Sequence, residues 1–549
     1  MPVRSPVTRL ATHEVTNQPP SLEDFNPFEA DLALKELIAS LGSAKLAHKL
    51  SRFGEQVGSA QMQEWAIQAN ENPPKHRPYD RYGHRIDEVH FHPAYHALME
   101  FGLTSEISSI AWTATAGGHS AHAAMMYLMG HADSGVCCPF SMTYAAVPVI
   151  RLNTALAADW ESLAISARYD PRLIPAPEKT GVTIGMAMTE KQGGSDVRAN
   201  TTQATRLADD DEYRLVGHKW FCSAPMSDGF LTLAQAEGGL TCFFVPRWQP
   251  DGTRNPIHIT RLKDKLGDRS NASSEIEYKE AWARRVGEEG RGVRTIIDMV
   301  QGTRLDCTAG SAGIMRAALT QALWHTAHRS AFQKKLVDQP AMRQTLADLV
   351  VETEAATALT FRIAQSFDNA TNDSSEAAFR RLATPVAKYW ICKRAPGFVY
   401  EAMECHGGAG YVEENPLPRL FRQSPLNSIW EGSGNVIALD ALRAIAREPE
   451  TVDALLREID ESRGVHDALD LAIDALKSLL RPTRMSEMNA RQFVEQCALT
   501  LQGALLARSA PNFVSDAFCN ARLQPDRGLT YGTGSLEDFA TRLIDRSMP

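Results

Sequence analysis

The spacing of apolar residues changes twice along this chain, and the two changes divide it into three kinds of structure. Up to about residue 165, apolar residues mostly recur every three to four positions, which is typical of amphipathic helices. Residues 182–188 alternate apolar and polar side chains instead, and similar stretches continue to residue 285, which predicts strands. From residue 293 the helical period returns. We therefore predict an α+β protein, mostly α, with a β domain between helical domains.

Breaks rich in proline, glycine and acidic residues set the expected boundaries, as in the linker 168–181 (R-Y-D-P-R-L-I-P-A-P-E-K-T-G) and the loop 286–292. The polar N-terminal end reads as an arm that needs a partner surface to become ordered. The predicted parts are an N-terminal arm, residues 1–30; an N-terminal helical domain, residues 31–181; a middle β domain, residues 182–285; a C-terminal four-helix domain, residues 286–447; and an extra helical extension, residues 448–549.

Within these parts the clearest patterns give individual elements. The predicted strands are 182–188, Tyr213–Phe221, Leu231–Ala234, Leu240–Val245 and Ser274–Tyr278. The predicted long helices are Val293–Gln333, Gln339–Phe367 and Ala377–Cys405. Trp220 and Phe221 occupy successive strand positions, so we expect one in the core and the other free to cover a planar ring.

Composition narrows the class of protein. A chain of 549 residues with 44% hydrophobic and 22% charged residues is long enough for several domains. The net charge of −9 gives no overall electrostatic attraction to nucleic acid. Nine cysteines without a C-x-x-C pair indicate a reducing cytoplasm rather than a disulfide framework or a metal site. No signal peptide and no apolar run of transmembrane length is visible, so we expect a cytoplasmic protein without a membrane span.

The stretch 427–435, N-S-I-W-E-G-S-G-N, is the strongest candidate for chemistry. It presents one carboxylate, Glu431, between a tryptophan and small residues, directly before an apolar-periodic run in which Ser433 or Asn435 can cap a helix. Glycines let a flat ligand approach the backbone, and free amides at a helix N-terminus suit an anion or a carbonyl oxygen. The alternative is an ordinary capping loop with an exposed acid.

Four further stretches suit a flavin or a pyrophosphate, although each is weak alone. Residues 188–196 (M-T-E-K-Q-G-G-S-D) supply hydroxyls and unhindered amides after a strand, where a plain tight turn is the alternative. Residues 217–223 (G-H-K-W-F-C-S) form a second strand end. Residues 329–339 are basic, and residues 404–411 contain a glycine-rich turn.

In this order and spacing, the motifs resemble the acyl-CoA dehydrogenase family of flavoproteins over about residues 80–447. The motifs are T-E-x-x-x-G-S-D from Thr189, the strand end K-W-F-C-S, V-G-E-E-G-R-G from Val286, R-x-x-F from Arg329, G-G-A-G-Y from Gly407 and the glutamate–glycine loop. The resemblance implies helical, β and helical domains, bound FAD, a homotetramer, and a glutamate that removes an α-proton from an acyl-CoA.

The resemblance also implies roles for single residues. Glu431 matches the catalytic base, and Arg304 matches an arginine near the acyl-CoA. Arg329 and Gln339 match residues that reach the FAD of a neighbouring subunit. The residues implied in flavin binding are Met188, Thr189, Ser195, Phe221, Ser223, Arg329, Gln339, Gly408, Trp430, Gly432, Ser433 and Asn435.

Some positions depart from the family pattern. Phe221 stands where the family usually has tryptophan, and Trp430 replaces a common tyrosine beside the base. Gln333 replaces a glycine, and Glu404 replaces a glutamine that normally meets the pyrophosphate. Because a carboxylate repels a phosphate, Glu404 is not expected to contact the cofactor unless it is protonated.

Further details, among them R-L-V-G-H-K-W-F and the additional C-terminal helices, resemble one branch of this family, the bacterial adaptive-response flavoproteins. That branch implies protection against DNA alkylation, binding of double-stranded DNA and weak isovaleryl-CoA dehydrogenase activity. Residues 476–510 carry five bases and two acids. This surplus of positive charge indicates either a track that binds phosphates or an ordinary solvated helix face. The candidate DNA contacts there are Lys477, Arg481, Arg484 and Arg491.

Three functions therefore remain open at this point. The first is an FAD-dependent acyl-CoA dehydrogenase that acts on a short branched acyl-CoA. The second is a DNA-binding flavoprotein with structural FAD and no physiological acyl-CoA substrate. The third is an interaction scaffold. Because Glu431 is present, base-catalysed oxidation of an acyl-CoA remains one of the possible functions.

Overall fold

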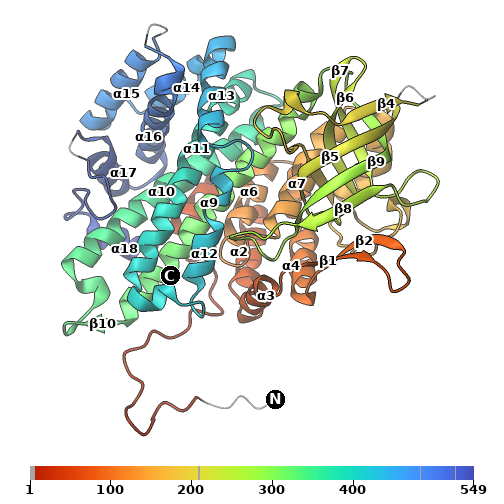
Figure 1. Cartoon of the computed structure of the whole chain (residues 1–549). Helices are drawn as coiled ribbons and strands as arrows, with labels where there is room; N and C mark the ends of the chain where they lie inside the picture. The colour runs from red at the N-terminus through yellow and green to blue at the C-terminus, as the bar shows by residue number, and fades with distance from the viewer. Residues whose placement is uncertain (1–5, 208–210, 482–483, 526) are drawn as a thin grey trace.

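The computed structural model describes residues 6–207, 211–481, 484–525 and 527–549, and begins with an extended arm followed by a layer of helices (Figure 1). Polar residues before several of these helices accept hydrogen bonds from the first-turn amides, as Asp31 and Ser59 do. The N-terminal elements are α1 (Leu32–Ser40), α2 (Ala44–Val57), α3 (Ala60–Glu71), β1 (Lys75–Tyr79), β2 (Arg85–His90), α4 (Pro93–Thr104), α5 (Ile110–Thr113), α6 (Gly118–Met129), α7 (Cys137–Ile150) and α8 (Thr154–Ala164).

The hairpin β1–β2 was not expected within a helical segment. Pro73 and Pro74 follow the end of α3, and the Asp80 side chain closes the turn by accepting from the Tyr82 and His84 amides. Prolines remove helical donors, and aspartate favours turns, so local sequence accounts for this departure.

The middle of the chain folds into one sheet whose pairings close a ring, in the order β6–β7–β9–β5–β4–β6. β3 pairs with β6 in parallel, and β8 pairs with β9. The sequence did not predict β4 and β8, because their residues are polar and partly exposed and give little periodic signal. The strands are β3 (Ile184–Ala187), β4 (Gln203–Arg206), β5 (Glu212–Ser223), β6 (Gly229–Ala236), β7 (Gly239–Pro246), β8 (Ile257–Leu262) and β9 (Ser273–Val286).

The expectation for Trp220 and Phe221 is wrong in one respect, because neither side chain enters the core. The pairing of β5 with β9 shifts register between Lys219 and Cys222, which interrupts the strict alternation of faces. The Lys263 ammonium lies 3.3 Å from the centre of the half-buried Trp220 ring. Phe221 is 47% exposed and therefore remains open to a planar ligand.

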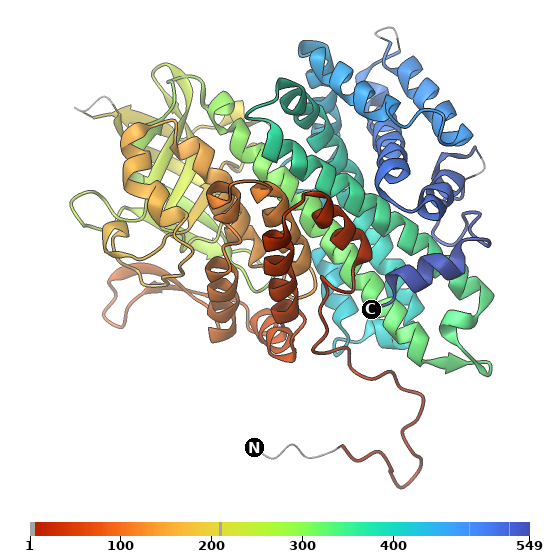
Figure 2. The same ribbon diagram turned by 180° about the vertical axis from the view of Figure 1, so that it is seen from behind.

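The third part is built around α9, which contacts α6, α7, α10 and α11 (Figures 1 and 2). α9 ends at His328, earlier than predicted, because residues 329–335 turn back in a small hairpin with Phe332 and Gln333 at positive φ. The elements are α9 (Gly292–His328), β10 (Ser330–Ala331), β11 (Lys334–Lys335), α10 (Pro340–Asn369), α11 (Ser374–Cys405), α12 (Pro416–Gln423) and α13 (Gly434–Arg447).

The C-terminal extension packs on α10 and α11 through apolar and ionic contacts. The guanidinium of Arg522 contacts Asp348 and Glu352 of α10, and Glu352 also binds Arg394 of α11 at 2.9 Å. Burial alone would raise the pKa of Glu352, but these two arginines lower it to about 2. The helices are α14 (Glu450–Asp460), α15 (Asp467–Leu479), α16 (Ala490–Ser509), α17 (Asn512–Phe518) and α18 (Ala540–Ser547).

Across the described residues, no helix combines the length and the apolar character that crossing a bilayer requires.

Candidate active site

Glu431 lies in the loop that enters α13, with its backbone in the left-handed region at φ 57°. Two buried cations hold this loop. Arg304 on α9 donates from Nε to the Glu431 carbonyl at 3.2 Å, and Lys388 on α11 donates to the Trp430 carbonyl at 2.9 Å and to the Gly432 carbonyl. Because a strained backbone persists only where its surroundings fix it, these contacts set the direction of the Glu431 side chain.

The Glu431 carboxyl is held close to α9 and α11, and burial raises its pKa. A hydrogen bond from Thr303 and the positive charges of Arg304 and Lys388 act in the opposite direction without cancelling the shift. A carboxylate with a raised pKa is a stronger base than an exposed one. The geometry therefore suits proton removal from a carbon acid.

Trp430 is fixed beside the carboxylate by hydrogen bonds rather than by burial alone. Its Nε1 donates to Asn427 Oδ1 at 2.8 Å, and Asn427 donates to Ser311 Oγ on α9 at 3.1 Å. The indole also packs against the apolar cluster where α7, the β domain and α9 meet. It therefore forms a rigid wall next to Glu431.

The β domain contributes the loop that follows β3. The Met188 carbonyl accepts from Asn200 at 2.9 Å, and the Thr189 carbonyl accepts from the Trp220 amide at 2.7 Å. Ser195 is exposed on the same loop. These contacts present the Thr189–Ser195 turn as a rigid edge.

Glu190 anchors this turn, and sequence reasoning did not single it out. Its carboxylate binds the Lys219 ammonium at 2.8 Å and accepts from Thr201 and Thr202, while the Glu190 and Lys219 side chains are both fully buried. Burial would raise the pKa of Glu190, but Lys219 and these donors lower it to about 2. The acid within the T-E-x-x-x-G-S-D motif was visible in the sequence, but its lysine partner lies 29 positions away.

Ser223, at the end of β5, lies against Cys138 of α7. Its Oγ lies 3.2 Å from Ser273 Oγ, which in turn lies 3.3 Å from the Lys265 ammonium. Burial raises the pKa of the Cys138 thiol on α7 to about 12; Ser223 hydrogen-bonds to this thiol, and the Glu431 charge raises its pKa further. Cys138 is thus near both groups, which brings the β-domain edge and the Glu431 loop together.

The N-terminus of α13 offers donors for an anion. Its N-cap residue, Ser433, is exposed and makes no side-chain capping bond. The side-chain ends of Arg491 and Lys393 approach Gly434, within 3.4 Å of the position that a Cβ would take there. Helix amides with two cations and a free hydroxyl suit a pyrophosphate. With the open face of Phe221 and the Thr189 edge, this donor set fits FAD.

Arg329, Gln339 and Gly408 lie elsewhere. Arg329 follows α9 and is 25 positions beyond Arg304, so about 37 Å of helix separates them. The rings of His325 and His406 are 4.4 Å apart, which joins the end of α9 to the glycine-rich turn that holds Gly408. The structure therefore groups these residues at the opposite end of α9 from Glu431.

Glu404, which departs from the family pattern, and Arg304, which matches it, both have defined partners. Glu404 is exposed and hydrogen-bonds to the Tyr400 hydroxyl, which raises the pKa of that tyrosine. Arg304, which the sequence places near an acyl-CoA, is already engaged by Asp440 at 2.6 Å and by the Glu431 carbonyl.

An arginine-rich cleft of about 1000 Å³ opens next to this site between the β domain, α9 and α11. Asp440 joins it to the Glu431 loop, because it binds both Arg304 at 2.6 Å and Arg381 at 3.2 Å. Gln301 also lines the cleft. It is 5% exposed, and neither its amide nitrogen nor its oxygen has a hydrogen-bond partner. The arginines that line the cleft are Arg198, Arg291, Arg294, Arg380, Arg381 and Arg447.

Sequence reasoning missed this cleft because its arginines come from four separate segments. Single arginines at these positions form no local pattern. Two sequence signals were available: Gly290 and Arg291 stand in the V-G-E-E-G-R-G motif, and Gln301 lies three residues before Arg304 on α9.

Comparisons with known proteins agree with this architecture. Residues 17–171 match the adaptive response protein AidB N-terminal domain, residues 185–281 the acyl-CoA dehydrogenase middle domain, and residues 290–446 the acyl-CoA dehydrogenase C-terminal domain. The chain is 44% identical to AidB of Escherichia coli (strain K12) over 534 residues, 97% of this chain and 98% of the relative.

Two comparisons lead to Caenorhabditis elegans. Acyl-CoA dehydrogenase family member 11 is 31% identical over 459 residues, 80% of this chain and 74% of that protein. The crystal structure of ACDH-11 in complex with C11-CoA superposes with a TM-score of 0.86 at 27% identity, covering 99% of both chains.

The chain therefore belongs to the acyl-CoA dehydrogenase family, FAD-dependent oxidoreductases that act on CH–CH bonds. Its first part and its similarity over nearly the whole length place it in the AidB branch of that family. The resemblance inferred from the sequence, the fold class and the FAD cofactor are confirmed.

Proposed function

We propose that this protein oxidises a short branched acyl-CoA, with isovaleryl-CoA as the representative substrate, at the bond between Cα and Cβ. One observation carries the proposal: a carboxylate with a raised pKa, Glu431, is fixed beside a cleft lined by arginines. The base would remove the α-proton of the acyl thioester.

FAD, when bound, supplies the acceptor for the hydride that leaves the β-carbon. The chain's own residues hold the reactants. Thr189 and Ser223 would contact the flavin ring, and Ser195 and Ser433 would bind the pyrophosphate. Lys388 and Arg304 hold the backbone of the Glu431 loop, and the carboxylate would face the substrate.

The arginine cleft fits the phosphates of coenzyme A. Six arginines line it against two acids, Asp298 and Glu448. Within the described part of the chain, Arg294 and Arg447 have no ion-pair partner, so their charges are free to meet phosphates. The Caenorhabditis elegans neighbour, solved with C11-CoA, supports a CoA thioester in this fold.

Trp430 supports the proposal of a short branched acyl group. Its indole is larger than the phenol of a tyrosine and is locked by Asn427. A rigid bulky wall beside the base leaves less room along the acyl chain, which favours short branched groups over long ones.

Substitution of Glu431 by glutamine tests the role of the base. Glutamine is nearly isosteric and cannot accept the α-proton, so flavin bleaching by excess isovaleryl-CoA without oxygen should slow by at least about 10²-fold. Flavin absorbance should be retained. Equal bleaching rates in the two proteins would remove Glu431 from this role.

Arg294→Met and Arg447→Met test the cleft separately. Loss of a charge-assisted phosphate contact should raise KM for isovaleryl-CoA about tenfold with little change in kcat. Arg151→Met, which removes a surface ion pair with Glu161, serves as the matched control and should leave KM unchanged. Unchanged KM in both cleft variants would place coenzyme A elsewhere.

We propose double-stranded DNA binding by the extension as a second function, with a role in protecting DNA against alkylation. Arg481, Arg484 and Arg491 are exposed, and none forms an ion pair within the described residues. Lys477 differs, because its ammonium binds both oxygens of Asp460 at 2.8 and 2.7 Å. The expected phosphate contacts are therefore the three arginines rather than Lys477.

Replacement of Arg481 and Arg484 by glutamate should weaken retention of a random duplex and leave the flavin spectrum unchanged. Adding Arg491→Glu should abolish retention and also lower flavin affinity, because Arg491 approaches Gly434 at the N-terminus of α13. Binding by the wild type should weaken with salt at a log–log slope of roughly −0.9 per phosphate neutralised. Lys477→Gln is the matched control and should bind like the wild type. A triple variant that still binds, or that still lowers alkylation damage in treated cells, contradicts this assignment.

A further inference from the structure

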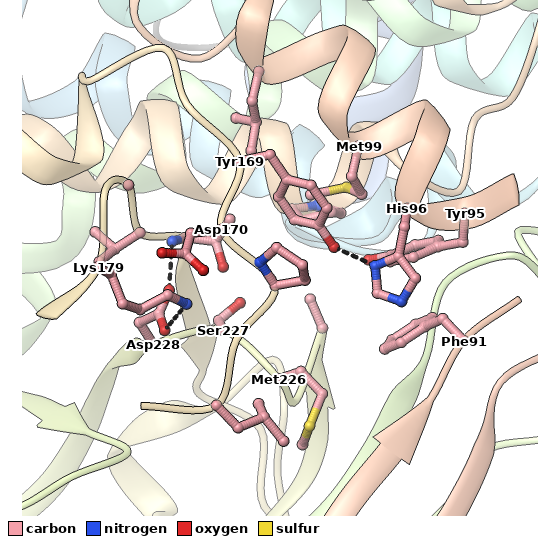
Figure 3. A pocket seen from close by; sticks show the side chains of 18 of the residues that line it. Phe91, Tyr95, His96, Met99, Tyr169, Asp170, Lys179, Met226, Ser227 and Asp228 are labelled. Carbon is pink, nitrogen blue, oxygen red and sulfur yellow. Dashed lines mark hydrogen bonds and ion pairs between the residues drawn. The ribbon is translucent and has the colours of Figure 1, made fainter. Parts of the chain in front are cut away.

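A second pocket lies between the N-terminal helices and the β domain, and it shares no lining residue with the arginine cleft (Figure 3). Its volume is about 270 Å³. The walls come from β2 and α4, the linker that precedes β3, and the turn between β5 and β6. The chemistry assigned to Glu431 uses none of these residues.

One half of this pocket is apolar and aromatic. The rings of Phe91 and Tyr95 stack with centroids 4.0 Å apart and an angle of 14° between their planes. Met99 and Met226 complete the walls, as Figure 3 shows. Methionine side chains adapt their shape to a ligand, and aromatic faces favour a planar one.

The other half holds unused hydrogen-bonding capacity. Ser227 is 2% exposed, and its hydroxyl has no hydrogen-bond partner. Figure 3 shows it between the aromatic group and the ion pair of Lys179 with Asp228, which are 2.6 Å apart. The Lys179 ammonium carries three N–H donors, and Asp228 is its acceptor in the described structure. A buried hydroxyl without a partner costs free energy unless a ligand or water satisfies it.

The charges favour an anionic head group over a cationic one. Asp228 is paired with Lys179 and also accepts from the Thr183 amide, and Asp170 is held by Arg172 at 2.6 Å. Arg168 lies exposed at the rim without an ion pair among the described residues. Both acids are therefore neutralised, while one cation remains free to attract an anion.

The volume limits the size of the ligand. A cavity of about 150 Å³ lined by apolar side chains is enough for benzene. The 270 Å³ here therefore admits one aromatic ring and a short polar substituent.

We propose that this pocket binds a small aromatic monocarboxylate, with its ring against Phe91 and Tyr95 and its carboxylate accepting from Ser227 and Lys179. The pocket borders the active site without belonging to it. Pro139 and Ala224 line it, and each directly adjoins a residue of the active-site region in the sequence, Cys138 and Ser223 respectively.

Titration of the FAD-loaded full chain with 4-fluorophenylacetate, followed by fluorine NMR, tests the proposal. Saturable binding at one site per chain is expected. Ser227→Ala should weaken it about tenfold, since it removes a hydrogen bond to a charged group. The neutral analogue 4-fluorotoluene should bind the wild type at least about tenfold more weakly for the same reason.

Two variants that fill the pocket from opposite sides serve as controls, Met226→Trp and Leu103→Trp. Each variant should eliminate binding, and its flavin absorbance should show that the fold is intact. Two variants are used so that the test still holds if one of them fails to fold. Absence of saturable binding to the wild type up to about 10 mM overturns the proposal. The proposal is also overturned if a folded variant with a filled pocket binds the ligand as well as the wild type does.

Discussion

At the scale of single residues, buried charges fix the loops that carry the chemistry. Glu190 and Lys219 tie the Thr189 turn to β5, and Lys388 ties the Glu431 loop to α11. A buried pair is costly to break because removing one partner leaves the other charge uncompensated. These residues therefore position the site although none is expected to touch the substrate.

Glu190→Gln should lower the free energy of unfolding by about 3–5 kcal/mol, measured in urea, because Lys219 is left unpaired. The double variant Glu190→Gln/Lys219→Met should recover part of that loss. The folded pKa of about 2 lies below the ordinary value of 4.5, so the unfolded chain binds more protons between these values. The stabilisation is therefore present above pH 4.5 and lost as the pH falls toward 2. A single variant as stable as the wild type contradicts this role.

The raised pKa of Glu431 gives a second prediction at this scale. Only the ionised carboxylate removes a proton, so kcat/KM for isovaleryl-CoA should rise with pH through the pKa of the free enzyme. Because burial raises that pKa, the midpoint of the acid limb should lie above the ordinary glutamate value of 4.5. A midpoint at or below 4.5 would contradict the burial of the base.

At the scale of elements, the C-terminal extension is held to the α10–α11 pair by a buried ionic cluster. Arg522 contacts Asp348 and Glu352, and Arg394 contacts Glu352 from α11. Through α16 the extension also reaches α13, where Arg491 approaches Gly434. The proposed DNA surface and the loop that holds Glu431 are therefore parts of one packed unit.

Arg522→Met should destabilise this docking by about 3–5 kcal/mol, because Asp348 loses its arginine partner and Glu352 loses one of its two. Hydrogen exchange should rise first in α14–α18, while amides of the β domain stay protected. Arg527→Met, which removes an exposed pair with Glu495, is the control and should change stability by less than about 1 kcal/mol. Uniform exchange across the chain in Arg522→Met would show that the extension does not unfold separately.

At the scale of the whole molecule, the candidate flavin residues form two groups at opposite ends of α9. One group surrounds Glu431; the other includes Arg329, which bonds to the Asn17 carbonyl of the N-terminal arm, and Gly408. Phe332, on the hairpin beside Arg329, is 92% exposed. A single chain cannot bring both groups to one flavin. We therefore propose that the homotetramer implied by the sequence resemblance forms, and that its subunits complete one another's FAD sites.

Mass photometry should accordingly give four times the chain mass of 60.4 kDa. Phe332→Glu should dissociate the assembly and release FAD together with it, because the exposed ring is the expected subunit contact. Lys45→Glu, a charge change on the exposed face of α2, is the control and should preserve both. A monomer that retains stoichiometric FAD would contradict the arrangement.

The sequence by itself determined the order of helical, β and helical parts, because the periods of 3.6 and 2 are local properties of the chain. It also placed Glu431, Thr189 and Ser223, which stand in continuous motifs at strand and helix ends. It did not reveal the hairpin after α3, β4 or β8, whose short polar runs carry little periodic signal. Only the tertiary structure brought together Glu190 with Lys219, Lys388 with the Glu431 loop, and the arginines of the cleft. Those contacts join distant segments, and the burial that gives them their strength exists only after the chain has folded.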